Sequence, residues 1–304
     1  MLALGLAATA AACDSDETTT TNAGTASGTS TGAGAVGGSG QGGSGATAGT
    51  GPTGGAGQEG GGGAAASLAL PPADAQLDYQ LGGAYPPPNG VQVLSRDRND
   101  APAPGLYTIC YVNGYQAQPD EDNWWLTQHP DLVLRDGGGD PVVDPDWDEM
   151  LLDVSTAQKR ADLAVIVGDW IAQCGADGFA AVEIDNLDSY SRSQGLLTED
   201  NAVAFMKLLS DAAHAEGLAI AQKNSTELLS RRAEMGTDFA VAEECNRYAE
   251  CGDYVAEYGN LVFVIEYRQQ DFNKGCTDHA NLSIVLRDLQ LVTPSSGNYV
   301  YDAC

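Results

Sequence analysis

The chain has 304 residues, and its 42 Asp and Glu residues against 14 Lys and Arg residues give a net charge of −28. This excess of negative charge argues against a nucleic acid as the partner, because phosphate groups are bound by basic patches. It permits a cationic partner, and it is also what many secreted proteins carry for solubility. Charge alone therefore does not choose between these last two explanations.

Residues 1–13 have the features of a bacterial lipoprotein signal. The short apolar stretch from Met1 to Ala12 ends in three alanines, directly before Cys13. In such signals the cysteine is lipidated and becomes the first residue, which predicts an extracellular or cell-surface protein anchored through Cys13; a plain cleaved signal peptide is the alternative. No other segment approaches the roughly 20 apolar residues that span a bilayer, so we expect membrane contact only through this anchor.

Residues 14–76 are predicted to be a disordered, low-complexity linker. The stretch 14–67 consists almost entirely of Gly, Ala, Ser and Thr, and it contains no aromatic residue. It cannot bury enough apolar surface to offset the entropy lost on ordering. It holds only four of the acids and no base, so the rest of the chain carries a net charge of about −24. The remaining residues, 77–304, suit one large α/β domain.

The six cysteines of this domain predict disulfides, because an even number of cysteines behind an export signal is typical of oxidised proteins. Cys245 and Cys251 enclose a short loop and are the easiest pair to close. Cys304 would tie down the C-terminus through Cys276, which leaves Cys110 with Cys174. Other pairings are possible for six cysteines, and one or two free buried thiols remain the alternative.

Strand-like and helix-like segments follow one another along the domain. Strands are predicted near residues 77–81, 91–94, 107–112, 151–154, 179–184, 218–222, 239–242, 261–265 and 284–286. Helices are predicted at 155–173 behind the capping residues Ser155 and Thr156, at 198–216 behind Thr198, at 225–235 and at 248–258. A long loop separates the strands near 107–112 and 151–154, and it contains Trp124, Trp125 and Trp147.

This alternation predicts parallel βαβ units, and the strand count favours a (β/α)8 TIM barrel over an open doubly wound sheet. Polar residues recur at strand ends, as if they converged on one mouth, whereas an open sheet concentrates its site at one switch point. These residues are Asp153, Asp185, Asn186, Lys223, Asn224, Glu243 and Glu266.

The stretch 178–186 is the centre of the predicted site. An apolar run ends there in Glu183 and Asp185, two residues apart. Side chains alternate between the faces of a strand, so both carboxylates should point the same way. A polar pair on a buried face costs free energy unless it is paired or used, which indicates a functional role.

A mouth lined with carboxylates, one lysine and several aromatic rings favours sugar chemistry. Glycoside hydrolysis needs two carboxyl groups, of which one is ionised and the other holds a proton. A metal site is the weaker alternative, because His129, His214 and His279 are scattered without ligand spacing, although a carboxylate cluster could hold a divalent cation. A Ser-His-Asp hydrolase lacks a credible nucleophile elbow. We therefore expect no metal and no cofactor.

Several segments together resemble the endo-α-1,4-polygalactosaminidase family, glycoside hydrolase family 114. They are 178–186 (GFAAVEIDN) with 188–190 (DSY), 218–224 (LAIAQKN), 239–245 (FAVAEEC) with Tyr248 and Cys251, and 264–267 (VIEY). Weaker similarity extends to 79–81 and 109–112. The resemblance covers most of residues 77–304 in order, and it implies a (β/α)8 barrel.

The resemblance implies Asp185 as the nucleophile on strand four and Glu243 as the general acid/base on strand six of a retaining mechanism. It places Glu183, Lys223, Asn224 and Glu266 near the site, as substrate contacts or as residues that tune the carboxyl pKa values. We further expect substrate contacts from Asn186, Tyr267, Tyr79, Tyr111 and Asp153. The chain departs from the family at 242–245, which reads AEEC where NEQC is usual, and at Asp78 and Tyr79, where the family has tryptophans.

The sequence thus predicts a lipid-anchored glycosidase for a cationic α-1,4-linked galactosamine polymer, acting as a monomer. A glycosidase for another α-galactoside or exopolysaccharide is one alternative, and activity on a neutral substrate would favour it. A non-catalytic carbohydrate-binding barrel is the other, against which the presence of both Asp185 and Glu243 argues.

Overall fold

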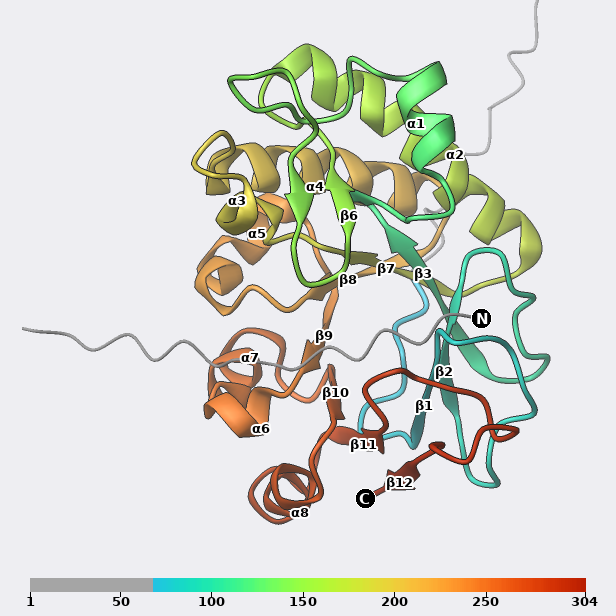
Figure 1. Ribbon diagram of the computed structural model, residues 1–304. Coiled ribbons are helices and arrows are strands. Elements are labelled where there is room, and N and C mark those ends of the chain that lie inside the picture. Colours follow the sequence, from blue (N-terminus) through green and yellow to red (C-terminus); the bar gives the residue numbers. More distant parts are fainter. Residues whose placement is uncertain (1–67) are drawn as a thin grey trace, which may run out of the picture. The chain divides into compact units, whose positions relative to one another are not determined.

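The computed structural model describes residues 68–304, so the predicted signal at 1–13, the lipidation site Cys13 and most of the predicted linker lie outside the described residues. The described part is built on eight parallel strands, as the sequence predicts (Figure 1). In sheet order they are β1 (Leu77–Gln80), β2 (Val93–Asp97), β3 (Tyr107–Asn113), β7 (Ala181–Asp185), β8 (Ala219–Lys223), β9 (Phe239–Glu243), β10 (Val262–Glu266) and β11 (Ser283–Arg287).

The two ends of this parallel series, β1 and β11, are joined by a buried ion pair. Arg287 Nη1 lies 3.2 Å from Asp78 Oδ1, and both side chains are fully buried. A final antiparallel strand, β12 (Tyr301–Ala303), pairs with β11, and the Tyr301 hydroxyl donates to the carbonyl of Leu77 in β1. Breaking a buried ion pair is costly, so Asp78 serves the closure of the barrel.

The helices lie outside the strands (Figure 1). They are α1 (Asp122–Gln128), α2 (Ala157–Asp177), α3 (Ser189–Arg192), α4 (Glu199–Ala215), η1 (Thr226–Arg231), α5 (Arg232–Met235), α6 (Cys245–Tyr248), α7 (Cys251–Tyr258) and α8 (Gln269–Asp278). Thr156 caps α2, and Thr198 begins α4 with a capping box, as their sequences predict. Gly178 ends α2 with a left-handed φ of 97°, which glycine adopts without strain.

Two predicted helices differ from the structure: the segment at 225–235 starts as the 3-10 helix η1, and the segment at 248–258 is divided between α6 and α7. The helices α1, α3 and α8 were not predicted. The connections 81–92 and 98–106 contain no helix, because Pro86, Pro87, Pro88, Pro102 and Pro104 interrupt them. The barrel therefore carries helices on most of its circumference but loops after β1 and β2.

The segment predicted as a barrel strand at 151–154 belongs to a separate small sheet. β6 (Glu149–Leu151) pairs antiparallel with both β4 (Gln116–Ala117) and β5 (Val143–Asp144). This sheet is inserted between β3 and α2, and Trp125 lies in helix α1 rather than in a loop. The insertion adds a side wall to one end of the barrel.

The barrel interior is filled by alternate residues of the strands, as pleating requires. Small residues such as Ala181, Ala219 and Ala221 are interleaved there with Phe239 and Phe263. The residues between them face outward and pack against the helices. Continuing the inward rows toward the carboxyl ends of the strands leads directly to the polar residues of the site.

Three disulfides hold the barrel to its surroundings, with the pairing that the sequence favours. They are Cys110–Cys174, Cys245–Cys251 and Cys276–Cys304. The first joins β3 to α2, and the third joins α8 to the residue after β12. Such cross-links are typical of proteins that function in oxidising, extracellular compartments.

Residues 68–76, the described end of the predicted linker, lie against the barrel. Ala75 is buried, and the Tyr107 hydroxyl donates to the carbonyl of Ala69. None of the helices within 68–304 combines the length and apolarity needed to cross a membrane.

Candidate active site

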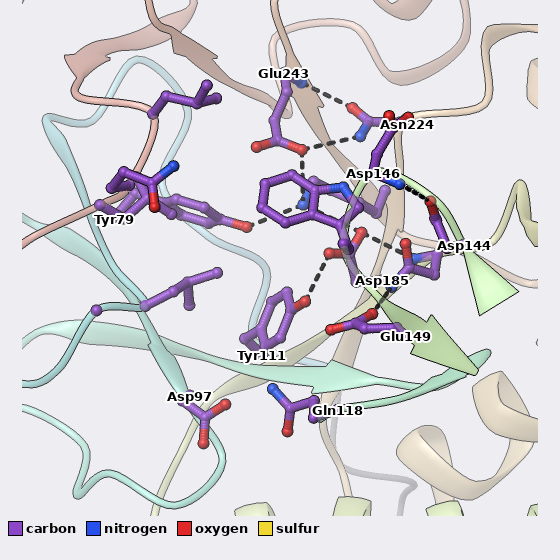
Figure 2. Close-up of a pocket in the computed structure, with 18 of the residues that line it drawn as sticks. Tyr79, Asp97, Tyr111, Gln118, Asp144, Asp146, Glu149, Asp185, Asn224 and Glu243 are labelled. Atoms are coloured by element: carbon purple, nitrogen blue, oxygen red, sulfur yellow. Dashed lines mark hydrogen bonds and ion pairs between the residues drawn. The ribbon is translucent and has the colours of Figure 1, made fainter. Parts of the chain in front are cut away.

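A cavity of about 350 Å³ opens at the carboxyl ends of the barrel strands. The inward rows of five strands end in its walls: Tyr79 on β1, Tyr111 on β3, Asp185 on β7, Lys223 on β8 and Glu243 on β9, with Tyr267 directly after β10. Figure 2 shows the side chains of Asp185 and Glu243 directed toward the same space. The expected convergence of polar strand ends is thus present, and Asn186 and Asn224 also line the cavity.

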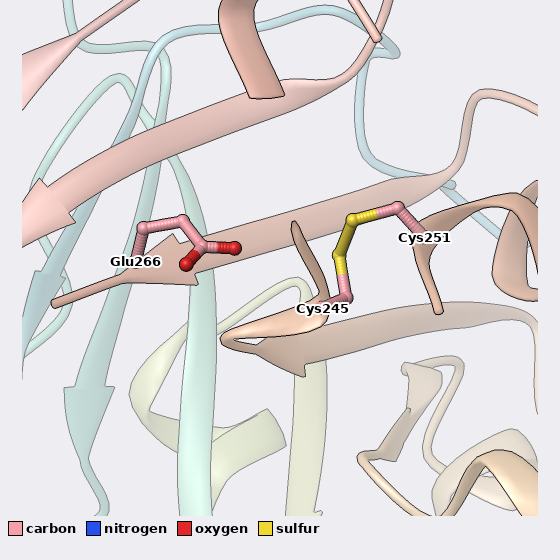
Figure 3. A group of neighbouring side chains, drawn as sticks. All are labelled: Cys245, Cys251 and Glu266. Carbon is pink, nitrogen blue, oxygen red and sulfur yellow. A yellow bond between two sulfur atoms is a disulfide. The ribbon is translucent and has the colours of Figure 1, made fainter. Parts of the chain in front are cut away.

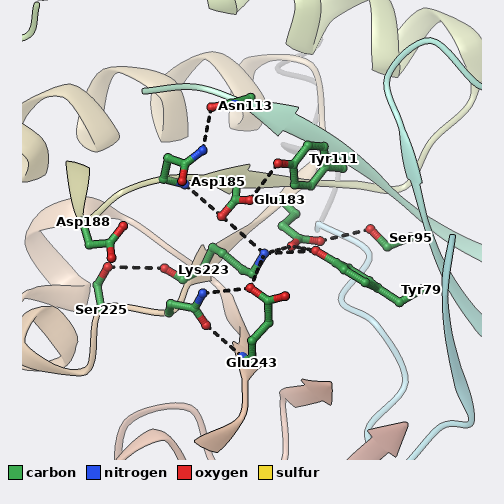
Figure 4. Close-up of polar contacts among 12 residues, drawn as sticks. Tyr79, Ser95, Tyr111, Asn113, Glu183, Asp185, Asp188, Lys223, Ser225 and Glu243 are labelled. Atoms are coloured by element: carbon green, nitrogen blue, oxygen red, sulfur yellow. Dashed lines mark hydrogen bonds and ion pairs between the residues drawn. The ribbon is translucent and has the colours of Figure 1, made fainter. Parts of the chain in front are cut away.

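The ammonium group of Lys223 lies at the centre of the site (Figure 4). Its Nζ is 3.2 Å from Glu183 Oε1, 3.3 Å from Asp185 Oδ1 and 3.1 Å from Glu243 Oε2. It also lies 3.0 Å from the Tyr79 hydroxyl. Burial opposes its charge, but the surrounding carboxylates outweigh burial and raise the pKa of Lys223 well above its ordinary value. The lysine is therefore held as a cation among three carboxyl groups.

Asp185 is arranged to stay ionised. The Tyr111 hydroxyl donates to its Oδ2 at 2.7 Å, and the backbone N–H of Asn186 donates to its Oδ1 at 2.8 Å. Burial favours the protonated form, yet Lys223 and these donors together hold the pKa of Asp185 below its ordinary value. An ionised carboxylate with fixed geometry is what a nucleophile in glycoside hydrolysis requires.

Glu243 is oriented by two neighbours. Asn224 Nδ2 donates to Glu243 Oε2 at 3.1 Å, and the Tyr267 hydroxyl donates to Oε1. Asn224 Oδ1 also accepts from the backbone N–H of Glu243 at 2.8 Å. The carboxyl group is thereby fixed at the cavity wall, within contact of Lys223.

A left-handed residue follows each of the three strands that carry these groups. Asn186 after β7 has φ 64°, Asn224 and Ser225 after β8 have φ 46° and 61°, and Glu244 after β9 has φ 57°. This conformation costs a residue other than glycine roughly 1–2 kcal/mol, and asparagine tolerates it best. The sharp turns let the chain leave the barrel immediately after each functional side chain. Strain of this kind concentrates at functional sites.

Three predicted contact residues do not line the cavity. Glu183 is fully buried beneath it, where the hydroxyls of Tyr79 and Ser95 donate to its two oxygens. Burial raises the pKa of Glu183, while Lys223 opposes the rise. Glu183 thus shares the inward face with Asp185, as predicted. It contacts Lys223 from beneath the cavity rather than a bound substrate. Asp153 lies in the connection between β6 and α2, where it pairs with Lys159 of α2.

Glu266 faces away from the barrel interior, because it continues the outward row of Val262 and Val264. Its Oε1 accepts from the backbone N–H of Asn246 at 2.8 Å and from the side chain of Asn246 at 3.1 Å. Burial raises the pKa of Glu266, and these hydrogen bonds oppose the rise. Glu266 therefore holds the start of α6, just beyond Glu243.

In the part of the chain that the structure describes, one group of side chains has the spacing of metal ligands. Cys245, Cys251 and Glu266 place their ligand atoms within 4.8 Å of one another (Figure 3). The two sulfurs are joined in a disulfide, however, and metal binding requires thiolates. The residues present there do not fit a metal ion.

The small antiparallel sheet contributes cavity residues that the sequence did not identify. Asp144, Asp146, Trp147 and Glu149 come from β5, β6 and the turn between them. Burial, together with Asp185 and Asp144, raises the pKa of Glu149 to about 7, against a hydrogen bond from Asn113. The run of acids around Trp147 was the feature of the sequence from which these cavity residues could have been predicted. Trp124 does not line the cavity and packs against Trp125 and His129.

The charge of the cavity is strongly negative. Seven acids and two bases line it. Arg192 is paired with Asp144 and Asp188, and Lys223 is paired with the carboxylates described above. The unpaired charge therefore belongs to acids, which attract a cationic ligand.

The chain is similar to known proteins in sequence and in fold. Residues 60–304 match the model of the glycoside-hydrolase family GH114. The chain is similar to Ega3 from Aspergillus fumigatus, solved in complex with galactosamine, with 23% identity, a TM-score of 0.62, and 78% of this chain and 98% of that chain covered. A variant of the glycoside hydrolase domain of PelA from Pseudomonas aeruginosa has 13% identity and a TM-score of 0.51, with 74% and 97% covered. A search of curated proteins finds no match. The chain belongs to glycoside hydrolase family GH114.

Proposed function

We propose that this glycosidase hydrolyses an α-linked galactosamine polymer, with Asp185 as the nucleophile and Glu243 as the general acid/base. The observation that carries the proposal is the pair of carboxyl groups that both contact Lys223, in a cavity with excess negative charge. A polymer with free amino groups is cationic and would neutralise that charge. The galactosamine complex of the similar Ega3 supports the same ligand chemistry.

The shared contact with Lys223 brings the two carboxyl groups close enough for a retaining mechanism. One oxygen of Asp185 lies 3.3 Å from Lys223 Nζ, and one oxygen of Glu243 lies 3.1 Å from the same nitrogen. These two oxygens are therefore at most about 6.4 Å apart, the sum of those distances. Retaining enzymes separate their carboxyl groups by roughly 5–5.5 Å, whereas inverting enzymes need roughly 6.5–9.5 Å to admit a water. This limit joins the nearest oxygens rather than the centres of the two carboxyl groups, and it admits the separation that retention requires.

In the proposed mechanism Asp185 attacks the anomeric carbon of the bound sugar, and Glu243 gives its proton to the departing glycosidic oxygen. The glycosyl–Asp185 ester is then cleaved by a water, which gives its proton to Glu243. Tyr111 and Lys223 hold Asp185 in the ionised form that the first step needs. Asn224 and Tyr267 fix the orientation of Glu243 in both steps.

The proposal extends to the surroundings of the enzyme. The disulfides fit an extracellular location. Lipid anchoring at Cys13, a linker made by the part of 14–76 that precedes residue 68, and a monomeric state complete the proposal: the linker would let the barrel reach polymer away from the membrane. Incorporation of a radiolabelled fatty acid into the full-length protein, lost in Cys13→Ser, tests the anchor.

The test of function is reducing-end release from deacetylated α-1,4-polygalactosamine. We expect release by the parent and a loss of at least about 10³-fold in Asp185→Asn and Glu243→Gln, while Asp169→Asn, on the exposed side of α2, matches the parent. Nuclear magnetic resonance of the first-formed product reports the mechanism, with an α-anomer for retention. A folded parent that releases nothing from this polymer but cleaves a neutral α-galactoside would overturn the proposed substrate.

A further inference from the structure

A second cavity of about 450 Å³ adjoins the first. It lies over the segments that follow β8 and β9, and its walls come from η1, α6 and the start of α7. The two cavities share Trp147, Asp188, Asn224, Glu243, Tyr267 and Leu289. They are therefore parts of one continuous depression, with Glu243 in the wall between them.

The second cavity contains the proposed general acid but not the proposed nucleophile. Glu243 lines it, whereas Asp185, Lys223 and Tyr111 line only the first. The general acid protonates the oxygen that joins the attacked sugar to its leaving group, and the nucleophile contacts the attacked sugar alone. A chain bound for cleavage must therefore place its leaving-group side against Glu243 and away from Asp185, where the second cavity lies.

We propose that the second cavity binds the leaving-group side of the polymer, and that Glu227 and Glu250 there bind the ammonium group of an amino sugar. This rests on the proposed function of Asp185 and Glu243. It adds the location of the leaving-group subsites and the residues that select their ligand.

The charges in the second cavity favour a cation. Five acids line it and no Lys or Arg does. Asp188, Glu243 and Glu244 pair with Arg192, Lys223 and Arg247, respectively.

Within residues 68–304, Glu227 and Glu250 are the two acids of this cavity without an ion-pair partner. Each accepts only from a hydroxyl group, Glu227 from Tyr190 and Glu250 from Thr226. An ammonium group would supply the missing countercharge, and a neutral sugar would not.

Two exposed aromatic side chains add a surface for sugar rings. Tyr248 is 58% exposed and Trp147 is 57% exposed. Tyr248 lines the second cavity, and Trp147 lines both cavities, beside the point of cleavage. Such rings combine an apolar face with a polar group at the edge, which suits contact with a sugar that has an apolar face and hydrated hydroxyl groups.

The experiment compares two substrates that differ in their leaving groups. An α-galactosaminyl fluoride releases fluoride and has no sugar beyond Glu243, whereas an α-1,4-galactosamine oligomer fills both cavities. For the double variant Glu227→Gln/Glu250→Gln we expect the ratio of kcat/KM for the oligomer to that for the fluoride to fall about tenfold. The control Asp253→Asn/Glu257→Gln removes the same charge from exposed positions of α7 that line neither cavity.

A second readout follows the transfer of the sugar to an added acceptor. The acceptor hydroxyl displaces Asp185 at the anomeric carbon and gives its proton to Glu243, so the ester bond breaks as the new glycosidic bond forms. The parent should transfer to galactosamine in preference to galactose, and the double variant should lose that preference. A role of Glu227 and Glu250 in stability alone would not change acceptor choice.

The outcomes separate the two levels of the proposal. If the parent cleaves both substrates and the double variant keeps the parent's ratio and acceptor preference, the leaving-group assignment is overturned and the proposed function stands. If the parent cleaves neither substrate, the proposed function fails, and the assignment fails with it.

Discussion

Asn224 holds Glu243 through two reciprocal hydrogen bonds. Its amide nitrogen donates to the carboxyl oxygen at 3.1 Å, and its amide oxygen accepts from the backbone N–H at 2.8 Å. The left-handed backbone of Asn224, with φ 46°, directs the side chain from the end of β8 toward the end of β9. One asparagine thus fixes both the backbone and the carboxyl group of the proposed acid/base.

Replacement of Asn224 by Ala should lower kcat more than it raises KM. Without its two bonds Glu243 loses a fixed orientation, and we expect kcat to fall about 10²-fold, since positioned proton transfer contributes about 10²–10⁴-fold. The loss should be larger on the polymer than on an α-galactosaminyl fluoride, because fluoride needs little help from a proton donor to leave. Asn273→Ala, at an exposed position of α8, is the control. Equal losses on the two substrates would show that Asn224 acts on something other than Glu243.

Removal of the Lys223 ammonium should destabilise the barrel. Lys223→Met leaves three carboxyl groups without their cation, and breaking a buried pair from one side costs about 3–5 kcal/mol. Adding Glu183→Gln removes one of those charges, so the double variant should recover part of the loss. Urea unfolding measures both variants, and a double variant less stable than Lys223→Met would contradict this account.

Glu149 should make stability depend on pH. Its pKa is about 7 in the folded protein, against 4.5 for an unperturbed glutamate, so the folded state holds the proton more tightly. The stabilisation is fully present below about pH 4.5 and is lost as the pH rises through about 7. Glu149→Gln stays neutral and should gain stability relative to the parent from pH 5 to pH 8. Parallel stability curves for the two proteins would show that Glu149 does not titrate in this range.

Two of the disulfides should differ in their contributions to stability and to activity. Cys110–Cys174 spans 64 residues and Cys245–Cys251 spans 6, so loop entropy predicts losses of about 4 and about 2 kcal/mol on replacement by serine pairs. Catalytic activity should fall more when Cys245–Cys251 is replaced than when Cys110–Cys174 is replaced, because Cys245 is two residues from Glu243. Thermal unfolding and kcat of the two double variants give the comparison, and equal activity in both would remove the positioning role of Cys245–Cys251.

Activity on a cationic polymer should fall as salt rises. Screening shortens the reach of the cavity's charge from about 10 Å at 0.1 M to about 3 Å at 1 M salt. We expect KM for polygalactosamine to increase several-fold over this range, with circular dichroism confirming that the fold is unchanged. A constant KM would remove long-range attraction from the account of binding.

The barrel and the central pair of acids could be predicted because their signals are local. Alternation along a strand places Glu183 and Asp185 on one face, and a parallel barrel brings the ends of β7, β8 and β9 to one mouth. The same alternation, applied to β10, would have separated Tyr267, which faces the cavity, from Glu266, which does not. That error was avoidable from the sequence.

The wall built by β4, β5 and β6 could not be predicted in this way. Its strands are two or three residues long, and their pairing joins Gln116 to Leu151 across a long insertion. Nothing in the local sequence decides that Trp147 is exposed beside the cavity while Trp125, in α1, is buried. Only the tertiary packing of the insertion makes that distinction.

The position of Lys223 has a consequence for the reaction cycle. Its nitrogen has four oxygen neighbours, from Tyr79, Glu183, Asp185 and Glu243, but an ammonium group has three hydrogens. In the proposed cycle Asp185 loses its negative charge on forming the ester, at the moment when Glu243 gains one by giving up its proton. One negative charge thus moves from 3.3 Å on one side of the ammonium to 3.1 Å on the other. The total charge around Lys223 stays constant through both half-reactions, so the lysine serves as a stationary counterion that exchanges one partner for another without itself gaining or losing a proton.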